Sequence, residues 1–523
     1  MFEKAYSLAS PVVSVPALLL IFAFVLEWVC DVGRLKGKSK LLGASEDEWF
    51  PRLKAHFRYC ADGFNIIYDT IDEKTDQIYQ IPFAGKRHYI LPARYIQELR
   101  SLPQHTVNSS GGIAEYFLGN FTSLHAVNAL GHTTWQTIRL NMTSDQKLGL
   151  MVDKLIQTCQ DTMRDALGVG QGWRTLTARP ALLDIIVKMN GPVLVGEELF
   201  KKSDWADICS SYAQSIFPMA IYLKMFPAFL HPIIGPLFPL WWRIQSLRRR
   251  ARKTLSAEVT ARLNEDQDEK IARKRDSQED MIDWLLQQSG DARQPQDVIN
   301  RQLGISFAAI HTSAVVIVKI MFALAERWDE YAPALIEELE QAITENGGEV
   351  RMDTVNKLAK LDSFMKEVFR HSPFTAISFQ RQLLKDHVLS DGTLLPKGSQ
   401  IAMASGPLSM SPSVYEEPNE FRGFRFATPR GQPDGPKVEL YTNSGVHGML
   451  FGHGRWACPG RFFAALGGKI ILMHVLANYE LRLPGGRMSP REKFADLQNL
   501  VPAAELEIRK RKPSAQLAAL ELQ

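Results

Sequence analysis

The pattern of apolar and polar positions changes after the first thirty residues of the chain. Residues 6–26 include no charged side chain, and residues 17–26 are apolar throughout. About twenty apolar residues suffice for a helix to cross a bilayer, so this stretch predicts one N-terminal transmembrane helix. It is followed by Arg34, Lys36, Lys38 and Lys40. This excess of positive charge on one side predicts that the remainder of the chain faces the cytosol.

A cleaved secretory signal is the alternative explanation of the apolar stretch. No small-x-small cleavage site follows it, and Glu27-Trp28 interrupts the place where one is expected. We therefore expect a membrane anchor over residues 1–30, a linker over residues 31–50 and one large domain over residues 51–523.

Helical patterns dominate the large domain. Residues with helix-compatible composition or periodicity are 52–59, 143–167, 243–275, 295–328 and 332–344. Strand signals gather in residues 77–91 and 383–403, the latter with the turn Ser390-Asp391-Gly392. The domain is predicted to be mainly α with a minor β portion.

One apolar segment does not fit a simple helix. Residues 216–242 are mostly apolar but contain five prolines, which makes a second transmembrane helix unfavourable. Two interpretations remain open: a buried loop region, or a surface patch that dips into the bilayer.

Composition and charge exclude some classes of protein. The net charge is +4, and acidic and basic residues are mixed along most of the chain, so nucleic acid is not an expected partner. The five cysteines have no paired spacing. This argues against a disulfide framework or a zinc ribbon and fits a reducing compartment.

The strongest local signal surrounds one of these cysteines. Gly452, Gly454 and Gly460 bracket Cys458, and a helix-compatible run over residues 462–476 follows. Glycine permits turns and close approach of the backbone to a flat ligand. Backbone N–H groups at a helix N-terminus stabilise a thiolate, which can serve as the axial ligand of a haem iron. A buried structural cysteine would leave the glycines unexplained.

Residues 451–461 resemble the haem-binding loop of cytochrome P-450 monooxygenases, in particular fungal ones. Phe451, Gly454, Cys458 and Gly460 match the fixed positions of that family. The resemblance implies haem b as the cofactor and Cys458 as the ligand of its iron. Trp456 stands where the family has an arginine or histidine that donates a hydrogen bond to a haem propionate. We expect its indole N–H to donate that bond instead.

Other motifs of the family occur in the expected order. Glu367 and Arg370 are three residues apart and share one helix face. The segment around Arg425 resembles the part that completes the family's Glu-Arg-Arg triad, so these three side chains are expected to form a network beneath the haem. Trp135 and Arg139 resemble the family's propionate-binding helix, with His132 as an alternative to Trp135.

The predicted long helix over residues 295–328 resembles the oxygen-binding helix of the family. The small Ala309 leaves room for dioxygen, and Thr312 is expected to deliver a proton there. His311 stands where relatives have an acid. It either relays protons near neutral pH or is a satisfied core histidine.

The resemblance implies a cytochrome P-450 fold and insertion of one oxygen atom from dioxygen into a bulky lipophilic small molecule. Electrons are expected from NADPH through a separate cytochrome P-450 reductase, with the chain held in the endoplasmic reticulum membrane as a single-pass protein in contact with lipid. The fungal character of the motifs indicates secondary metabolism and a terpenoid or prenylated polycyclic substrate. The alternatives are a haem-thiolate isomerase or dehydratase that consumes no dioxygen, and a non-enzymatic haem carrier or sensor.

Overall fold

The computed structural model describes residues 22, 25–28, 35, 38–45, 47–82, 87–122, 132–168, 170–276, 279–288, 295–427 and 439–522. The expected transmembrane segment lies outside the described residues except for positions 22, 25 and 26. Within the described part of the chain, Pro295–Glu326 and Arg461–Asn478 are long and apolar enough to cross a membrane, but both are mostly buried in the protein. They are core helices.

Helices make up most of the fold. The longer ones are α2 (Pro51–Thr70), α8 (Asp145–Leu167), α9 (Ala178–Val195), α11 (Trp205–Lys224), α13 (Pro239–Asn264), α16 (Pro295–Glu326), α17 (Trp328–Glu345), α19 (Ala359–His371) and α21 (Arg461–Asn478). Shorter ones are α3 (Ile96–Leu99), α4 (Ser109–Tyr116), α5 (Gly119–Thr122), α7 (His132–Asn141), α10 (Glu197–Lys202), α12 (His231–Ile234), α14 (Gln267–Asp276), α15 (Met281–Gln288), α18 (Met352–Asn356) and α20 (Ser405–Ser409).

The strands form small sheets. In the described residues, the largest sheet has the order β1 (Ser39–Leu41), β2 (Ile78–Gln80), β3 (His88–Leu91), β9 (Gln400–Met403), β6 (Ser378–Leu383) and β4 (Val107–Asn108). A second sheet joins β10 (Tyr479–Arg482), β13 (Glu505–Lys510) and β5 (Arg174–Thr177). Two antiparallel pairs are β11 (Arg491–Phe494) with β12 (Leu497–Leu500), and β7 (His387–Val388) with β8 (Leu394–Leu395). The mainly α architecture with a minor β portion is confirmed.

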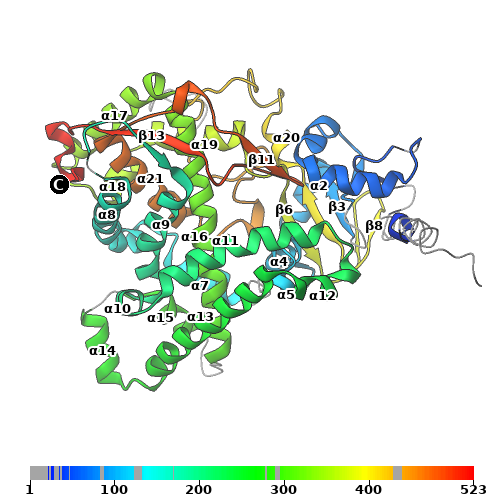
Figure 1. Cartoon of the computed structure of the whole chain (residues 1–523), viewed down its shortest axis with the longest axis horizontal. Coiled ribbons are helices and arrows are strands. Elements are labelled where there is room, and N and C mark those ends of the chain that lie inside the picture. The colour runs from blue at the N-terminus through cyan, green and yellow to red at the C-terminus, as the bar shows by residue number, and fades with distance from the viewer. Residues whose placement is uncertain are drawn as a thin grey trace, which may run out of the picture.

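The helix α16 runs through the helical part of the molecule (Figure 1). It packs against α9, α13, α11 and α21, and most of its side chains are buried. Figure 1 shows α8, α17, α18 and α21 on one side of it, and α2, β3 and β8 on the far side of the molecule. The predicted long central helix is thus present, ending at Glu326.

Two predicted boundaries differ from the structure. The predicted helix over residues 243–275 is broken into α13 and α14 at Glu265 and Asp266. Strand β1 lies inside the predicted linker over residues 31–50 and pairs in parallel with β2. The folded domain therefore begins before residue 51. The sequence did not predict this strand, because its partner is distant in sequence and three residues are too few to show an alternating pattern.

The proline-rich segment 216–242 is mostly helical, so the buried-loop interpretation is wrong. Helix α11 continues through Pro218, and Pro232 and Pro239 occupy first turns of helices, where proline is tolerated. Several large apolar side chains are exposed from the end of α11 to the first turn of α13. We call them the apolar patch: Tyr222, Met225, Phe226, Phe229, Ile233, Leu237 and Trp242.

Candidate functional site

The loop before α21 holds Cys458 in a tight backbone arrangement. The N–H of Cys458 donates to the Phe451 carbonyl oxygen at 2.7 Å, and the N–H of Gly452 donates to Met449 at 2.9 Å. Gly454 has a φ of +73°, and a Cβ there would lie 2.6 Å from the Arg100 carbonyl oxygen. Only glycine satisfies both conditions. The loop is therefore shaped by its own glycines and by its contact with residue 100.

Not every glycine of the motif is needed for the same reason. Gly452 also has a left-handed φ, of +71°. Gly460, by contrast, has a φ of −83°, and nothing lies within 4 Å of a Cβ placed there. Neither backbone conformation nor protein packing explains glycine at position 460.

The side chain of Cys458 is accessible although it lies deep in the protein. Burial raises the pKa of its thiol, and N–H groups of Gly460 and Arg461 together with the Arg461 charge oppose that rise. The predicted stabilisation of a thiolate at the start of α21 is thus present but smaller than the cost of desolvation. A bound metal cation would remove that cost, because a coordinating thiol is deprotonated.

One face in the middle of α16 is open. Ala308 and Thr312 are exposed and one turn apart, whereas most of the helix is buried, and Ala309 is half-buried. The hydroxyl of Thr312 donates to the Ala308 carbonyl at 2.6 Å. The hydroxyl proton is held by its own helix here, while the oxygen keeps a lone pair free to accept.

His311 directly precedes Thr312 on α16, and its side chain is buried next to this face. Its ring stacks on Phe217 of α11 with centroids 4.1 Å apart, and Phe307 lies 6.2 Å away. Burial, with the charge of Arg179 as a second cause, lowers the pKa of His311 to about 3. The low pKa and the aromatic packing favour the core-histidine interpretation of His311. The proton relay stays a prediction.

Trp135 on α7 meets the cysteine loop and uses its donor within the protein. The indole N–H of Trp135 donates to the Ala457 carbonyl at 3.3 Å. The indole N–H of Trp456 donates to the Leu102 carbonyl at 3.0 Å, and the two indole rings are 6.2 Å apart. Arg139 lies over the Trp135 ring at 5.2 Å.

The single indole N–H of Trp456 has a backbone carbonyl as its acceptor in this structure. Through this bond Trp456 ties the loop to Leu102. The expected hydrogen bond to a haem propionate stays a prediction. The side chain of His132, the alternative to Trp135, lies outside the described side chains.

The expected network of Glu367, Arg370 and Arg425 is present and buried. Arg370 donates to both carboxylate oxygens of Glu367, at 2.7 and 2.8 Å. Arg425 donates to one of them at 3.2 Å, and so does the N–H of Arg422 at 2.9 Å. Arg370 also donates to the Pro418 carbonyl at 2.7 Å. This network ties α19 to the segment 416–425.

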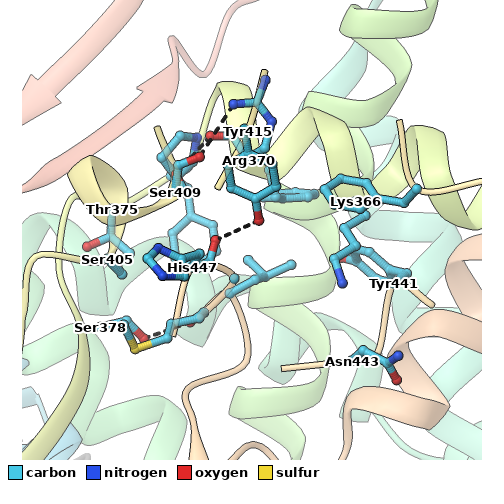
Figure 2. A pocket seen from close by; sticks show the side chains of 17 residues that line it. Lys366, Arg370, Thr375, Ser378, Ser405, Ser409, Tyr415, Tyr441, Asn443 and His447 are labelled. Carbon is cyan, nitrogen blue, oxygen red and sulfur yellow. Dashed lines mark hydrogen bonds between the residues drawn. The ribbon is translucent and has the colours of Figure 1, made fainter. Parts of the chain in front are cut away.

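A small interior cavity of about 50 Å³ lies beside this network (Figure 2). Figure 2 shows Arg370, Tyr415 and His447 on its wall, with the Tyr415 hydroxyl donating to the His447 carbonyl at 3.2 Å. A water molecule needs roughly 10–15 Å³ of such space. The cavity can hold a few waters and is far too small for a bulky substrate.

Sequence reasoning missed one residue, Arg381 on β6. Its side chain is 2% exposed and lies on the buried face of the strand, between Phe379 and Leu383. It donates to Ser109 at 3.0 Å and to the His453 carbonyl at 3.3 Å, but its buried Nε has no partner. Burial lowers its pKa to about 9. Within the described residues no acidic side chain pairs with it.

The signal for Arg381 was present in the sequence. An arginine on the apolar face of an alternating strand is unusual, because a buried charge is costly without a counter-charge. A guanidinium in this position calls for an anionic partner that the described part of the chain does not supply.

Comparison with known proteins identifies the family. Residues 60–507 match the family model described as Cytochrome P450. The chain is 30% identical to the cytochrome P450 monooxygenase AN1598 of Emericella nidulans over 428 residues. The match covers 81% of this chain and 78% of that protein. It is also 30% identical over 436 residues to the cytochrome P450 monooxygenase BOA4 of Botryotinia fuckeliana, covering 82% of this chain and 86% of that protein.

Another relative is the ent-kaurene oxidase of Gibberella intermedia, 28% identical over 477 residues, covering 89% of this chain and 86% of that protein. Among solved structures, the retinoic acid-bound cyanobacterial CYP120A1 matches with a TM-score of 0.61 and 18% identity, over 83% of this chain and 92% of that one. The chain belongs to the cytochrome P450 family, and it is an oxygenase with a haem cofactor.

The residues present fit a haem. Cys458 offers an accessible sulfur at a buried position, which is the ligand that haem-thiolate proteins use. Arg381 offers a buried guanidinium with an unpartnered Nε, which suits a carboxylate such as a haem propionate. These are two independent requirements of one cofactor, and the chain meets both.

Proposed function

We propose that the protein is a haem-thiolate monooxygenase that inserts one oxygen atom from dioxygen into a terpenoid or prenylated polycyclic molecule. The observation that carries the proposal is the accessible sulfur of Cys458 before α21, with Ala308 and Thr312 open on α16. Haem supplies the activation of dioxygen and the transfer of its oxygen atom. Electrons are proposed to come from NADPH through a separate reductase.

Each side chain then has a task. Cys458 holds the iron, and Arg381 balances the charge of a propionate. At the open face of α16, the hydroxyl oxygen of Thr312 accepts a proton, and the hydroxyl group then passes a proton on. Phe217 and Phe307 form an apolar wall beside that face, which excludes water and orients a lipophilic substrate.

The substrate class rests on this wall and on one relative. Phe307 packs with Phe217 at 6.2 Å, and Phe117 continues the wall at 5.1 Å from Phe217. Such a wall recognises apolar surface and offers few polar groups. A relative of similar length is named for oxidation of ent-kaurene, which is a terpene hydrocarbon.

The test is the fate of labelled dioxygen. Full-length protein with an NADPH-cytochrome P450 reductase in lipid vesicles is supplied with ¹⁸O₂ and a panel of terpene hydrocarbons that includes ent-kaurene. We expect one ¹⁸O atom in the product for each NADPH oxidised. Product formed without consumption of oxygen would instead indicate a haem-thiolate isomerase or dehydratase. Tight haem binding without any turnover would indicate a carrier or sensor.

Replacing Thr312 by alanine is expected to divert electrons from product to hydrogen peroxide. Positioned proton transfer contributes about 10²–10⁴-fold to such reactions, so the product formed per NADPH should fall by about tenfold or more. The ratio of hydrogen peroxide to NADPH measures it. Ser313→Ala is the matched control, because Ser313 makes the same kind of bond to Ala309 one residue further along. Unchanged coupling in Thr312→Ala would make Thr312 structural.

We also propose that residues 1–30 anchor the chain in the endoplasmic reticulum membrane as a single span, with the catalytic domain facing the cytosol. The apolar patch is proposed to rest on the same membrane, since exposed apolar surface of this extent marks a contact with a partner or a lipid surface. Ile233 and Leu237 are its most exposed members, at 66% and 76%.

Removal of residues 1–30 is expected to weaken membrane association without abolishing it. In that shortened protein, Leu237→Glu should weaken binding to neutral phospholipid vesicles by about tenfold or more, because burying a leucine contributes about 1.5–3 kcal/mol. Val388→Glu is the control, since Val388 is also exposed, at 60%, but lies on β7. Equal effects of the two substitutions in vesicle co-sedimentation would contradict the role of the patch.

A further inference from the structure

A buried lysine lies at the point where the open face of α16 ends. Lys319 comes seven positions after Thr312, which places it two helical turns further along the same face, about 10 Å away. Ala308 and Thr312 are exposed, whereas residues 317–320 are all buried, and Lys319 itself is 7% exposed. The open face is thus closed at Lys319.

The ammonium group of Lys319 binds the end of α19, which packs against α16. Its Nζ donates to the Ser372 carbonyl at 3.2 Å and to the Pro373 carbonyl at 3.1 Å. Ser372 is the C-terminal cap of α19. The last carbonyls of a helix have no partner within it and carry partial negative charge, so they attract a cation. These two bonds join the helix that carries Thr312 to α19.

Stability does not explain a lysine at this position. Burial lowers the pKa of Lys319 to about 7, and the charge of Arg491 is a second cause. Among the residues that the structure describes, no carboxylate pairs with Lys319. Taking a charge out of water is costly without a counter-charge, and an apolar side chain of similar volume in place of such a charge is often neutral or stabilising. A methionine would fill the same space at a lower free-energy cost.

The segment after α19 connects this contact to the cysteine loop. Five residues beyond Pro373, the hydroxyl of Ser378 donates to the Met449 carbonyl at 2.9 Å. The same carbonyl accepts the N–H of Gly452 at 2.9 Å, at the start of the loop that holds Cys458. The bonds at the end of α19 therefore link α16 to the frame that holds this loop.

Three helices meet close to this contact with little space between them. A Cβ at Gly468 of α21 would lie 3.0 Å from Cδ1 of Ile317 on α16 and 3.3 Å from Cε of Met365 on α19. Helix α21 begins directly after the cysteine loop, so its distance from α16 affects the gap between that loop and the open face. Apolar contacts are not directional, whereas hydrogen bonds require a defined distance and angle. Lys319 supplies directional contacts at this junction.

We propose that Lys319 is a positioning residue that fixes the spacing between α16 and the Cys458 loop, and so holds the Thr312 hydroxyl at the place where oxygen is activated. The proposal rests on the proposed function, in which Cys458 holds the iron and Thr312 passes on a proton. Proton transfer requires the two heavy atoms to lie within hydrogen-bond reach. A change of this spacing therefore affects the reaction even where the fold is intact.

Lys319→Met tests this role, because methionine keeps most of the side-chain length but has no N–H to donate. In the haem-loaded full-length protein, the infrared C–O stretching band of the carbon monoxide complex should shift and broaden, since it responds to the groups above the iron. With reductase and an accepted terpene, hydrogen peroxide per NADPH should rise about threefold or more, because a misplacement of about 1 Å can slow a positioned step up to about 10²-fold. The urea midpoint should be unchanged or higher, since a buried charge is removed.

Two further variants complete the series. Lys319→Gln keeps N–H donors on a shorter side chain, so its band and its peroxide yield should lie between those of the wild type and Lys319→Met. Lys510→Met is the matched control, because Nζ of Lys510 also donates to a backbone carbonyl, that of Leu522, at 2.9 Å near the C-terminus. It should match the wild type in the infrared band and in peroxide yield.

The outcomes separate a positioning role from a structural one. An unchanged band and unchanged peroxide yield in Lys319→Met would overturn the role of Lys319 alone. A lower urea midpoint in that variant, or its failure to fold, would equally overturn it, because Lys319 would then be structural. A wild type that lacks the thiolate band, or that places no oxygen from dioxygen in its product, would overturn the proposed function and the positioning role with it.

Discussion

Replacing Cys458 by alanine is expected to abolish the red-shifted absorption band that reduced, thiolate-ligated haem shows with carbon monoxide. Cys458 provides the accessible sulfur in its loop, and alanine offers the iron no ligand. The loop should persist, because its geometry depends on the Cys458 N–H bond to Phe451 and on left-handed glycines, none of which alanine changes. Haem should be lost, or retained with a spectrum lacking that band.

The control for this experiment is another cysteine of the same chain. Cys209 lies on α11 in the apolar core and is buried. Cys209→Ala should leave the carbon monoxide band unchanged. A normal band in Cys458→Ala, or its loss in Cys209→Ala with haem still bound, would refute Cys458 as the ligand.

Glu367→Gln is expected to destabilise the fold strongly, because it removes the carboxylate that Arg370 and Arg425 share. Glu367 is 0% exposed and balances both guanidinium groups. Removing one partner of a buried ion pair leaves an uncompensated charge, which costs about 3–5 kcal/mol. Because the network joins α19 to the segment that leads into the cysteine loop, haem content should fall with the free energy of unfolding.

Asp184→Asn provides the matched comparison, since Asp184 pairs with Lys188 at 2.8 Å on an exposed helix face. An exposed pair of this spacing contributes about 0.3–0.5 kcal/mol, so that variant should match the wild type in urea unfolding and in haem content. Equal unfolding midpoints for Glu367→Gln and Asp184→Asn would show that the buried network does not support the domain.

Much of this architecture follows from local sequence patterns. The long helix around Thr312 is predicted because seventeen uncharged residues separate Arg301 from Lys319, and helical periodicity needs no tertiary information. The cysteine loop is predicted because glycines report backbone conformation directly. The contact of Glu367 with Arg370 is local too, since residues three apart share one helix face.

Features that depend on residues distant in sequence, such as hydrogen-bond partners and shifted pKa values, became known only from the structure. The sequence could not assign the Trp456 N–H to Leu102, because 354 positions separate the two residues. Burial in the fold, rather than residue type, lowers the pKa of His311 to about 3, and the ring that stacks on it, Phe217, comes from α11. Asp496 shows no local pattern, and its three hydroxyl partners come from α2, α4 and the segment before β6.

The physical reason is the same in each case. Helical periodicity and glycine conformations depend on neighbouring residues, so short stretches of the sequence predict them. Burial, pKa and the choice of hydrogen-bond partner depend on which elements pack together, and they exist only once the chain has folded. Local sequence patterns therefore predict the family motifs and the helices that carry them. Tertiary packing sets which donors, acceptors and charges are left for the haem and the substrate.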